Sequence, residues 1–111
     1  MNSIIIVGRV TRKPSLSTTN DGKNYCKFIV AVNKNKTEAN YFTCVAWKNQ
    51  AEVVAKFLEQ GSLVGVRGSM ESHSYEKDGK KLTAWEILVS ECQFLSGKEE
   101  QPQENDDGLP F

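Results

Sequence analysis

The chain has 111 residues, 39% of them hydrophobic and 25% charged, which allows one domain with a single modest core. No apolar run approaches the ~20 residues that span a bilayer, and residues 1–10 lack the pattern of a signal peptide, so we expect a cytoplasmic protein without a membrane partner. The formal net charge of zero divides into +5 on residues 1–98 and −5 on residues 99–111, so the body favours an anionic ligand, while the acidic segment either adds solubility or competes for the same surface.

The first half of the chain predicts three strands. Residues 3–10 are a β-branched run that contains Gly8, which is typical of a strand bent at a bulge or barrel corner. Residues 12–24 are rich in turn formers and predict a loop. Residues 25–33 and 41–47 alternate and predict two strands with one core-facing side each. In the second of these, Phe42, Cys44 and Ala46 share the core side.

Residues 49–61 predict the one helix. Asn49 can cap its first turn, Glu52 stands where a capping-box partner belongs, and Gly61 suits a left-handed stop. The apolar residues of this segment follow helical spacing, so the helix is expected to close a core rather than to bind a ligand.

The second half predicts a fourth strand at 62–70 and a hairpin at 72–90 around the turn Asp78-Gly79, which residues 91–95 extend. This order predicts an all-β fold: a five-stranded Greek-key barrel of the OB type with its helix between strands three and four. A small sandwich is the alternative. We assign residues 1–96 to the barrel and residues 97–111, by composition, to a short disordered linker and an acidic tip.

The pattern does not favour an enzyme. It contains no glycine-rich phosphate loop, no nucleophile elbow and no cluster of metal ligands, so we expect no catalytic residue, metal or cofactor. His73 is interpreted as a surface histidine. Cys26, Cys44 and Cys92 lie far apart in apolar stretches and are interpreted as buried, reduced thiols.

Aromatic residues interleaved with cations favour binding. Tyr41 and Trp47 fall on the non-core face of one strand, about 20 Å apart, and Tyr75 lies in the hairpin. Either stacked bases or a second subunit would cover this face. Trp85 has the parity of core residues on its strand and is interpreted as a core or interface residue. The cations that would make the groove electropositive are Arg9, Arg12, Lys13, Lys34, Lys36, Lys48, Arg67, Lys77, Lys80 and Lys81.

Several segments together resemble a known family. "IIIVGRVTRKP", "FIVAVN", "YFTCVAWKNQAEVVAKFLEQGSLVGVRGSM", the hairpin start at 75–79 and the last six residues, "DDGLPF", have the order and spacing of bacterial and phage single-stranded DNA-binding proteins of the homotetrameric OB-fold type. The resemblance implies sequence-independent binding and protection of single-stranded DNA in replication, recombination and repair. It also implies a homotetramer, with a dimer as the alternative, in the bacterial nucleoid or encoded by a phage or mobile element.

The resemblance also implies roles for individual residues. Tyr41, Trp47 and Tyr75 match the family's stacking positions, and Lys48 or Asn49 matches a phosphate contact. The acidic tip matches the segment with which the family recruits replication, repair and recombination proteins; its residues are Asp106, Asp107, Leu109, Pro110 and Phe111.

Three features depart from the family pattern. Lys36 stands at a common aromatic position, Ser17-Thr18 replaces a common Arg-Tyr pair, and residues 97–105 are a short linker. These departures predict lighter DNA contacts. Two other classes stay open: a protein-interaction adaptor with weak DNA affinity, and an OB-type module for RNA or for a primosome.

Overall fold

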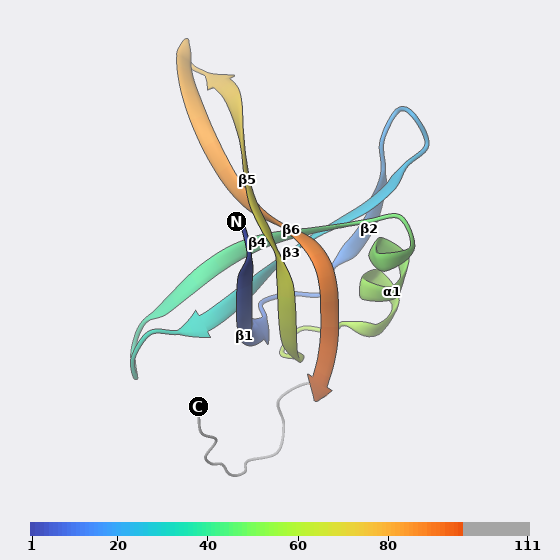
Figure 1. The fold of residues 1–111 in the computed structure, drawn as a ribbon, viewed down its shortest axis with the longest axis vertical. Helices are drawn as coiled ribbons and strands as arrows, with labels where there is room; N and C mark the ends of the chain where they lie inside the picture. The colour runs from blue at the N-terminus through green and yellow to red at the C-terminus, as the bar shows by residue number, and fades with distance from the viewer. Residues whose placement is uncertain (97–111) are drawn as a thin grey trace.

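The computed structural model describes residues 1–96, and the predicted linker and acidic tip lie outside the described residues. Within this part the chain forms a six-stranded sheet and one helix (Figure 1). The elements are β1 (Ile4–Val10), β2 (Ser15–Thr18), β3 (Asn24–Asn33), β4 (Ala39–Trp47), α1 (Asn49–Phe57), β5 (Leu63–Lys77) and β6 (Lys80–Ser96).

The sheet closes on itself, which confirms the predicted OB-type barrel and not a sandwich. Its strands run in the order β1-β5-β6-β4-β3-β2, and the end of β1 also pairs with β3, through Arg9–Ala31 and Val10–Val30. All pairs are antiparallel except β4–β6, in which Cys44 lies opposite Ile87. Helix α1 follows β4 directly and lies at one side of the barrel (Figure 1).

Gly8 is required where β1 changes its partner. The strand pairs with β5 from Ile4 to Arg9 and meets β3 at its end, so two neighbours crowd the residue between these contacts. A Cβ added at Gly8 would overlap the carbonyl oxygen of Ala31 and lie 2.9 Å from a methyl carbon of Val30. The predicted bend at Gly8 is therefore a strand crossing in which only a hydrogen fits.

Two elements differ from the prediction. The loop expected at 12–24 contains β2, which pairs with β3 from Ser15–Lys27 to Thr18–Asn24. The strand expected at 62–70 and the first strand of the hairpin are one strand of 15 residues. Strand β6 is continuous over 17 residues, in agreement with the predicted extension by residues 91–95. The turn itself is as predicted, since Asp78 and Gly79 both have positive φ, 54° and 75°.

The helix boundaries also differ. The N-cap is Lys48, without a side-chain cap, and Glu52 accepts a hydrogen bond from Asn24 Nδ2 at 2.8 Å, so the predicted capping box is wrong. The helix ends at Phe57, because Leu58 is already extended at φ −85° and ψ 138°. Gly61 has the predicted positive φ, 89°, but in the following turn.

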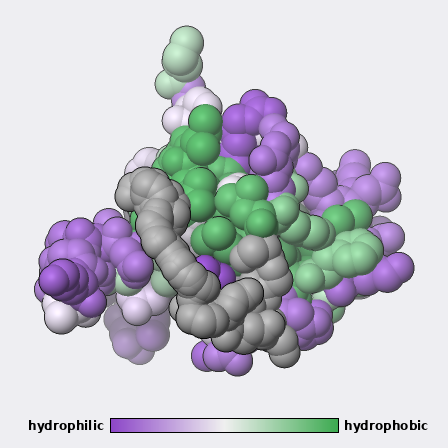
Figure 2. All heavy atoms as spheres, turned by 90° about the horizontal axis from the view of Figure 1, so that it is seen from below, coloured by the Kyte–Doolittle hydropathy of each residue, from purple (hydrophilic) through white to green (hydrophobic). Residues whose placement is uncertain are grey.

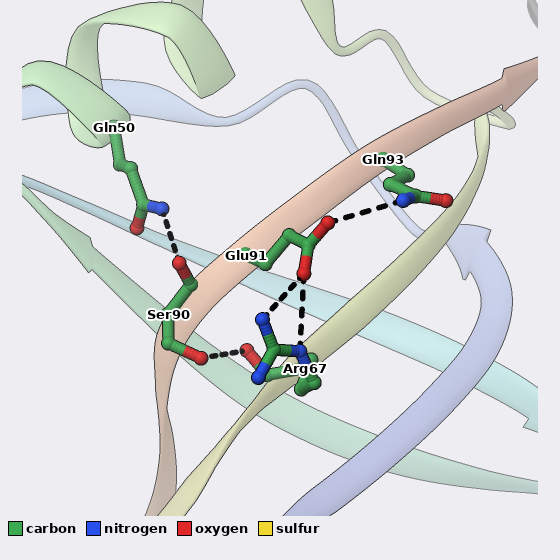
Figure 3. Close-up of polar contacts among 5 residues, drawn as sticks. All are labelled: Gln50, Arg67, Ser90, Glu91 and Gln93. Atoms are coloured by element: carbon green, nitrogen blue, oxygen red, sulfur yellow. Dashed lines mark hydrogen bonds and ion pairs between the residues drawn. The ribbon is translucent and has the colours of Figure 1, made fainter.

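A bulge marks the place where β5 and β6 leave the barrel. Arg67 lies opposite Glu91 and Gly68 lies opposite Val89, so Ser90 is an extra residue on β6. Its hydroxyl donates to the carbonyl oxygen of Arg67 at 2.9 Å, and its own carbonyl oxygen accepts from Gln50 Nε2 at 2.7 Å (Figure 3). Helix α1 thus holds the bulge. Beyond it the hairpin projects from the barrel, and we call residues 71–86 the arm (Figure 1).

The core fills the barrel with apolar side chains from β1, β3, β4, β5, β6 and α1, among them Val10, Phe28, Cys44, Leu58 and Ile87. Cys26 and Cys44 are buried and Cys92 is half-buried, and all three are free thiols. Burial raises the pKa of Cys44 to about 12 and that of Cys92 to about 11, so both stay protonated at neutral pH. The prediction of reduced structural thiols agrees with this packing.

Candidate nucleic-acid interface

A groove of about 380 Å³ opens between the barrel surface and the arm. One wall comes from the β2–β3 turn, β3 and β4, and the other from the part of β5 and β6 that rises beside them (Figure 1). The residues that line it, which we call the groove residues, are Thr19, Tyr25, Lys27, Val45, Trp47, Glu71, His73, Glu86 and Leu88.

Strand register explains why these residues meet. Tyr25 pairs with Trp47 and Lys27 with Val45, so the non-core faces of β3 and β4 form one surface. Val45 also pairs with Leu88 of β6, which carries this surface across to the arm. On the arm Glu71 lies opposite Glu86, so both carboxylates belong to the same face.

Two aromatic rings form one end of the groove. The centroids of Tyr25 and Trp47 lie 5.3 Å apart and the ring planes are inclined by 39°. Trp47 keeps 37% of its surface exposed although it packs on its neighbour. An aromatic ring that is partly exposed beside a second ring is suited to stack on a planar ligand.

The other two predicted stacking residues share the face but do not line the groove. Tyr41 is 67% exposed and lies opposite Ala31, at the far end of β4 from Trp47. Tyr75 is 44% exposed and lies opposite Leu82, further out on the arm than Glu71. The three aromatic positions therefore follow one continuous surface rather than a single pocket.

Trp85 is on the opposite face of the arm. It has the parity of Ile87, which is buried, but is itself 60% exposed. The arm extends beyond the barrel, so no core lies under Trp85, and the interpretation as a core residue is wrong. Its interpretation as an interface residue stays a prediction.

The groove is not uniformly basic. Lys27 Nζ lies 3.1 Å from Glu86 Oε2, and His73 Nδ1 lies 3.9 Å from Glu86 Oε1. The side chain of Glu86 is only 18% exposed, whereas those of Lys27 and His73 are more than half exposed. The expected electropositive groove therefore contains a shielded carboxylate next to its aromatic end, and His73 has the exposure expected of a surface histidine.

Three predicted cations lie beside this surface. Lys34 and Lys36 are exposed in the β3–β4 turn, which Asn35 and Glu38 hold together by side-chain and backbone hydrogen bonds. Lys48 follows Trp47 directly and has an unusual backbone, φ 59° and ψ −127°. Its N–H donates to the carbonyl oxygen of Asn24 at 2.8 Å. Non-glycine residues with such dihedral angles cluster at functional sites.

Two other predicted cations, Arg9 and Lys13, bind backbone carbonyl oxygens away from the groove. Arg9 Nη1 donates to the carbonyl oxygen of Gly61 at 3.0 Å. Lys13 Nζ donates to the carbonyl oxygens of Ala55 and Leu58, both at 3.0 Å. Arg12 is exposed in the segment between β1 and β2 and is not a groove residue. Arg9 and Lys13 are thus used within the fold.

Arg67 belongs to a different surface. Its guanidinium donates twice to Glu91 Oε1, at 2.6 and 3.0 Å (Figure 3). These bonds and one from Gln93 hold the pKa of Glu91 below its usual range. The pair lines a hollow on the outside of β1, β5 and β6, which we call the outer hollow; its residues are Ile5, Val7, Gly65, Val66, Arg67, Glu91, Gln93 and Leu95.

The outer hollow has an apolar part. Ile5, Val7 and Leu95 are 68%, 41% and 46% exposed. Figure 2, which looks at the molecule from below, shows hydrophobic residues gathered beside hydrophilic ones on the side of the molecule seen there. Such gathered apolar surface marks an interaction site more often than scattered single residues do.

Sequence reasoning missed most of the groove residues, among them Tyr25, Lys27, Glu71 and Glu86, and it did not place His73 in a groove. A signal for two of them was present. Cys26 and Phe28 identify the core face of β3, so Tyr25 and Lys27 had to lie on the same outer face as Trp47 once β3 and β4 were paired. Nothing in the sequence predicted that the arm would stand over this surface.

Within residues 1–96 no group of His, Cys, Asp or Glu side chains could hold a metal ion. The same part of the chain contains no helix long and apolar enough to cross a membrane.

The fold and the groove define a small OB-type barrel with an aromatic binding surface. Residues 1–95 match the model of the single-strand binding protein family, and the chain belongs to this family. The prediction of a binding protein instead of an enzyme agrees with that membership.

The chain is similar to curated proteins of several bacteria. It is 41% identical over 102 residues to the single-stranded DNA-binding protein of Bacillus cereus, an alignment that covers 86% of this chain and 60% of that protein. It is 38% identical over 113 residues to single-stranded DNA-binding protein 1 of Staphylococcus aureus, covering 96% and 72%. The chain thus spans about three fifths of the length of the Bacillus relative.

Proposed function

We propose that this protein binds single-stranded DNA without strict sequence selectivity. The observation that carries the proposal is the continuous outer face on which Trp47, Tyr41 and Tyr75 are exposed and Tyr25 is half-buried. Bases stack on such rings for about 1–3 kcal/mol each, and every base has a π face. The named relatives and the family membership support the same ligand.

In our proposal, the bound DNA strand follows this face from the β3–β4 turn to the arm. Lys34, Lys36 and Lys48 are exposed along it and contact phosphates, and the lysines at the tip of the arm continue the row. A strand held on aromatic rings cannot fold into hairpins, which protects it during replication, recombination and repair. The last six residues, "DDGLPF", are proposed to recruit proteins of these processes through their acidic and apolar side chains.

The protein is also proposed to associate with further copies of itself. On its side away from β5, β1 pairs with a described strand only at Arg9 and Val10, so the edge at 4–7 is open. An open apolar edge is a template for a second strand. Ile5 and Val7 next to this edge form the apolar part of the outer hollow, which a second copy would cover. A homotetramer built on this contact is our proposal, with a dimer as the smaller form.

Titration of tryptophan fluorescence tests the DNA proposal. The chain contains Trp47 and Trp85, so the variant Trp85→Phe leaves Trp47 as the only reporter. We expect strong quenching of this variant by a thymidine oligomer of about 35 nucleotides at about 0.2 M salt, where purely electrostatic binding is weakened.

The matched loss-of-function pair is Trp47→Ala and Trp85→Ala. We expect Trp47→Ala to weaken binding at least about fivefold, because one stacking ring is lost. Trp85→Ala changes an equally large side chain on the opposite face of the arm and should leave the affinity nearly unchanged. Weak binding by the wild-type chain without quenching would contradict the proposal and favour the protein-interaction adaptor.

A further inference from the structure

The groove contains a carboxylate that general binding of an anionic strand does not explain. Glu86 is at a groove position of β6, and its side chain is 18% exposed. Glu71, the residue opposite, also lines the groove, so two of the nine groove residues are acidic. A carboxylate repels phosphate, and partial burial strengthens that repulsion because water screens it less.

We therefore do not expect a phosphate of the DNA strand to bind at this end of the groove. The neighbours of Glu86 suit a base instead. Tyr25 and Trp47 offer rings for stacking, and Val45 and Leu88 add apolar surface to the lining of the same groove. Glu86 and His73 line the β5–β6 wall of the same groove, so this wall is where polar groups can meet the edge of a base stacked on the rings.

The two oxygens of Glu86 differ in their partners. Oε2 lies 3.1 Å from Lys27 Nζ, and this contact keeps the side chain against the β3 wall. Oε1 faces His73 Nδ1 at 3.9 Å, which is beyond hydrogen-bond distance, and within residues 1–96 it accepts no hydrogen bond. One half-shielded acceptor oxygen is therefore available to a ligand.

We propose that Glu86 selects bases with an exocyclic amino group, cytosine and adenine, over thymine at this one position of the strand. A carboxylate only accepts hydrogen bonds, and Glu is a suitable acceptor for the N4 amino group of cytosine. Thymine presents the acceptor O4 at the corresponding place. Its one donor on that edge, N3–H, lies between two carbonyl oxygens that repel the carboxylate, so thymine is the poorer partner. The inference rests on the proposed DNA binding and adds a base preference to it.

The test compares deoxycytidine and thymidine oligomers of equal length with wild-type protein and with Glu86→Gln. The glutamine has nearly the same shape, and its amide can either donate or accept. We expect the affinity ratio of deoxycytidine to thymidine to fall at least about fivefold in the variant, the low end of the discrimination by a hydrogen-bonded base pair contact. Removal of a negative charge raises the affinity for both oligomers equally, so this gain does not change the affinity ratio.

Glu76→Gln is the matched control. Glu76 is exposed on the same arm but has the opposite parity to Glu71 and His73, so it faces away from the groove. The variant Glu76→Gln removes the same negative charge and should leave the affinity ratio of deoxycytidine to thymidine unchanged. A second variant, Lys27→Gln, leaves Glu86 without its cation and should shift the ratio further toward deoxycytidine. Lys27→Gln therefore tests the base preference even if the variant Glu86→Gln does not fold.

The outcomes separate the two proposals. If the wild-type chain binds neither oligomer, the proposed function is wrong. If it binds both, and neither Glu86→Gln nor Lys27→Gln changes the ratio beyond the control, the base preference is wrong and DNA binding stands. A ratio that falls in Glu86→Gln and rises in Lys27→Gln supports the inference.

Discussion

At the scale of single residues, crowding at strand crossings decides which side chains the barrel accepts. Gly8 and Gly68 both sit where a Cβ would overlap a carbonyl oxygen, of Ala31 and of Leu88 respectively. Gly65 lies in the same sheet, but a Cβ there would meet only Leu95 and Val7, at 3.7 and 3.9 Å. Ordinary van der Waals contact starts at such distances, so these glycines are not equivalent.

Gly8→Ala should therefore destabilise the fold and Gly65→Ala should not. We expect the free energy of unfolding to fall by about 1–3 kcal/mol or more in Gly8→Ala, because the backbone of β3 has to move away from the new methyl group. Gly65→Ala adds the same group at ordinary van der Waals distance from Leu95 and Val7 and serves as the control. Urea denaturation followed by circular dichroism measures both. Equal stability of the two variants would contradict the crossing described at Gly8.

At the scale of elements, β1 and the arm each have a free side for a different reason. The arm is exposed because β5 and β6 continue beyond the barrel, and it brings Glu71, His73 and Glu86 over the face of β3 and β4. The edge of β1 at 4–7 is open because β3 reaches this strand only at Arg9 and Val10. We assign the arm to DNA and the β1 edge to a second copy.

Ile5→Glu should break the proposed self-association. The side chain is 68% exposed in a single copy, so the folded chain tolerates the charge, but an interface would have to bury it unpaired. Sedimentation velocity should show a shift toward the mass of one chain. Val53→Glu makes the same kind of change on α1, where the residue is 46% exposed, and should leave the mass unchanged. A wild-type chain that sediments as a monomer would contradict the proposal.

At the scale of the whole molecule, charge is divided between a body with net +5 and a segment, 99–111, with net −5. We propose that this segment competes with DNA for the lysines of the body through long-range attraction, which salt screens beyond about 10 Å at 0.1 M. In that proposal DNA binding and partner recruitment are coupled, since a DNA strand that occupies the body leaves the acidic segment available to other proteins.

A variant that ends at residue 98 tests this coupling. We expect it to bind thymidine oligomers several-fold more tightly than the full chain at low salt, and equally tightly near 1 M salt, where the screening length is about 3 Å. It should also lose its binding to replication and repair proteins. The control is the full chain with its five segment acids changed to the corresponding amides. If the variant and the full chain have equal affinities at low salt, competition by the segment is excluded.

The sequence by itself determined strands β1, β3 and β4, the turn of the hairpin, and the outer face that carries Tyr41 and Trp47. Alternation places Cys26 and Phe28 inside β3 and Trp47 outside β4, and it does so locally, because successive side chains of a strand point to opposite faces. The turn at Asp78-Gly79 is equally local, since both residues have positive φ. These features depend on near neighbours in the chain, so they can be predicted without the fold.

The tertiary structure alone decided where the helix ends and which groups the groove brings together. Leu58 keeps the apolar spacing of a helix, but it is extended, and Lys13 from a distant segment binds its carbonyl oxygen and that of Ala55. Glu86 likewise meets Lys27 and His73 only because β6 passes beside β4 and the arm rises over the sheet. Contacts between residues far apart in the chain depend on register and crossing geometry, and no local pattern encodes them.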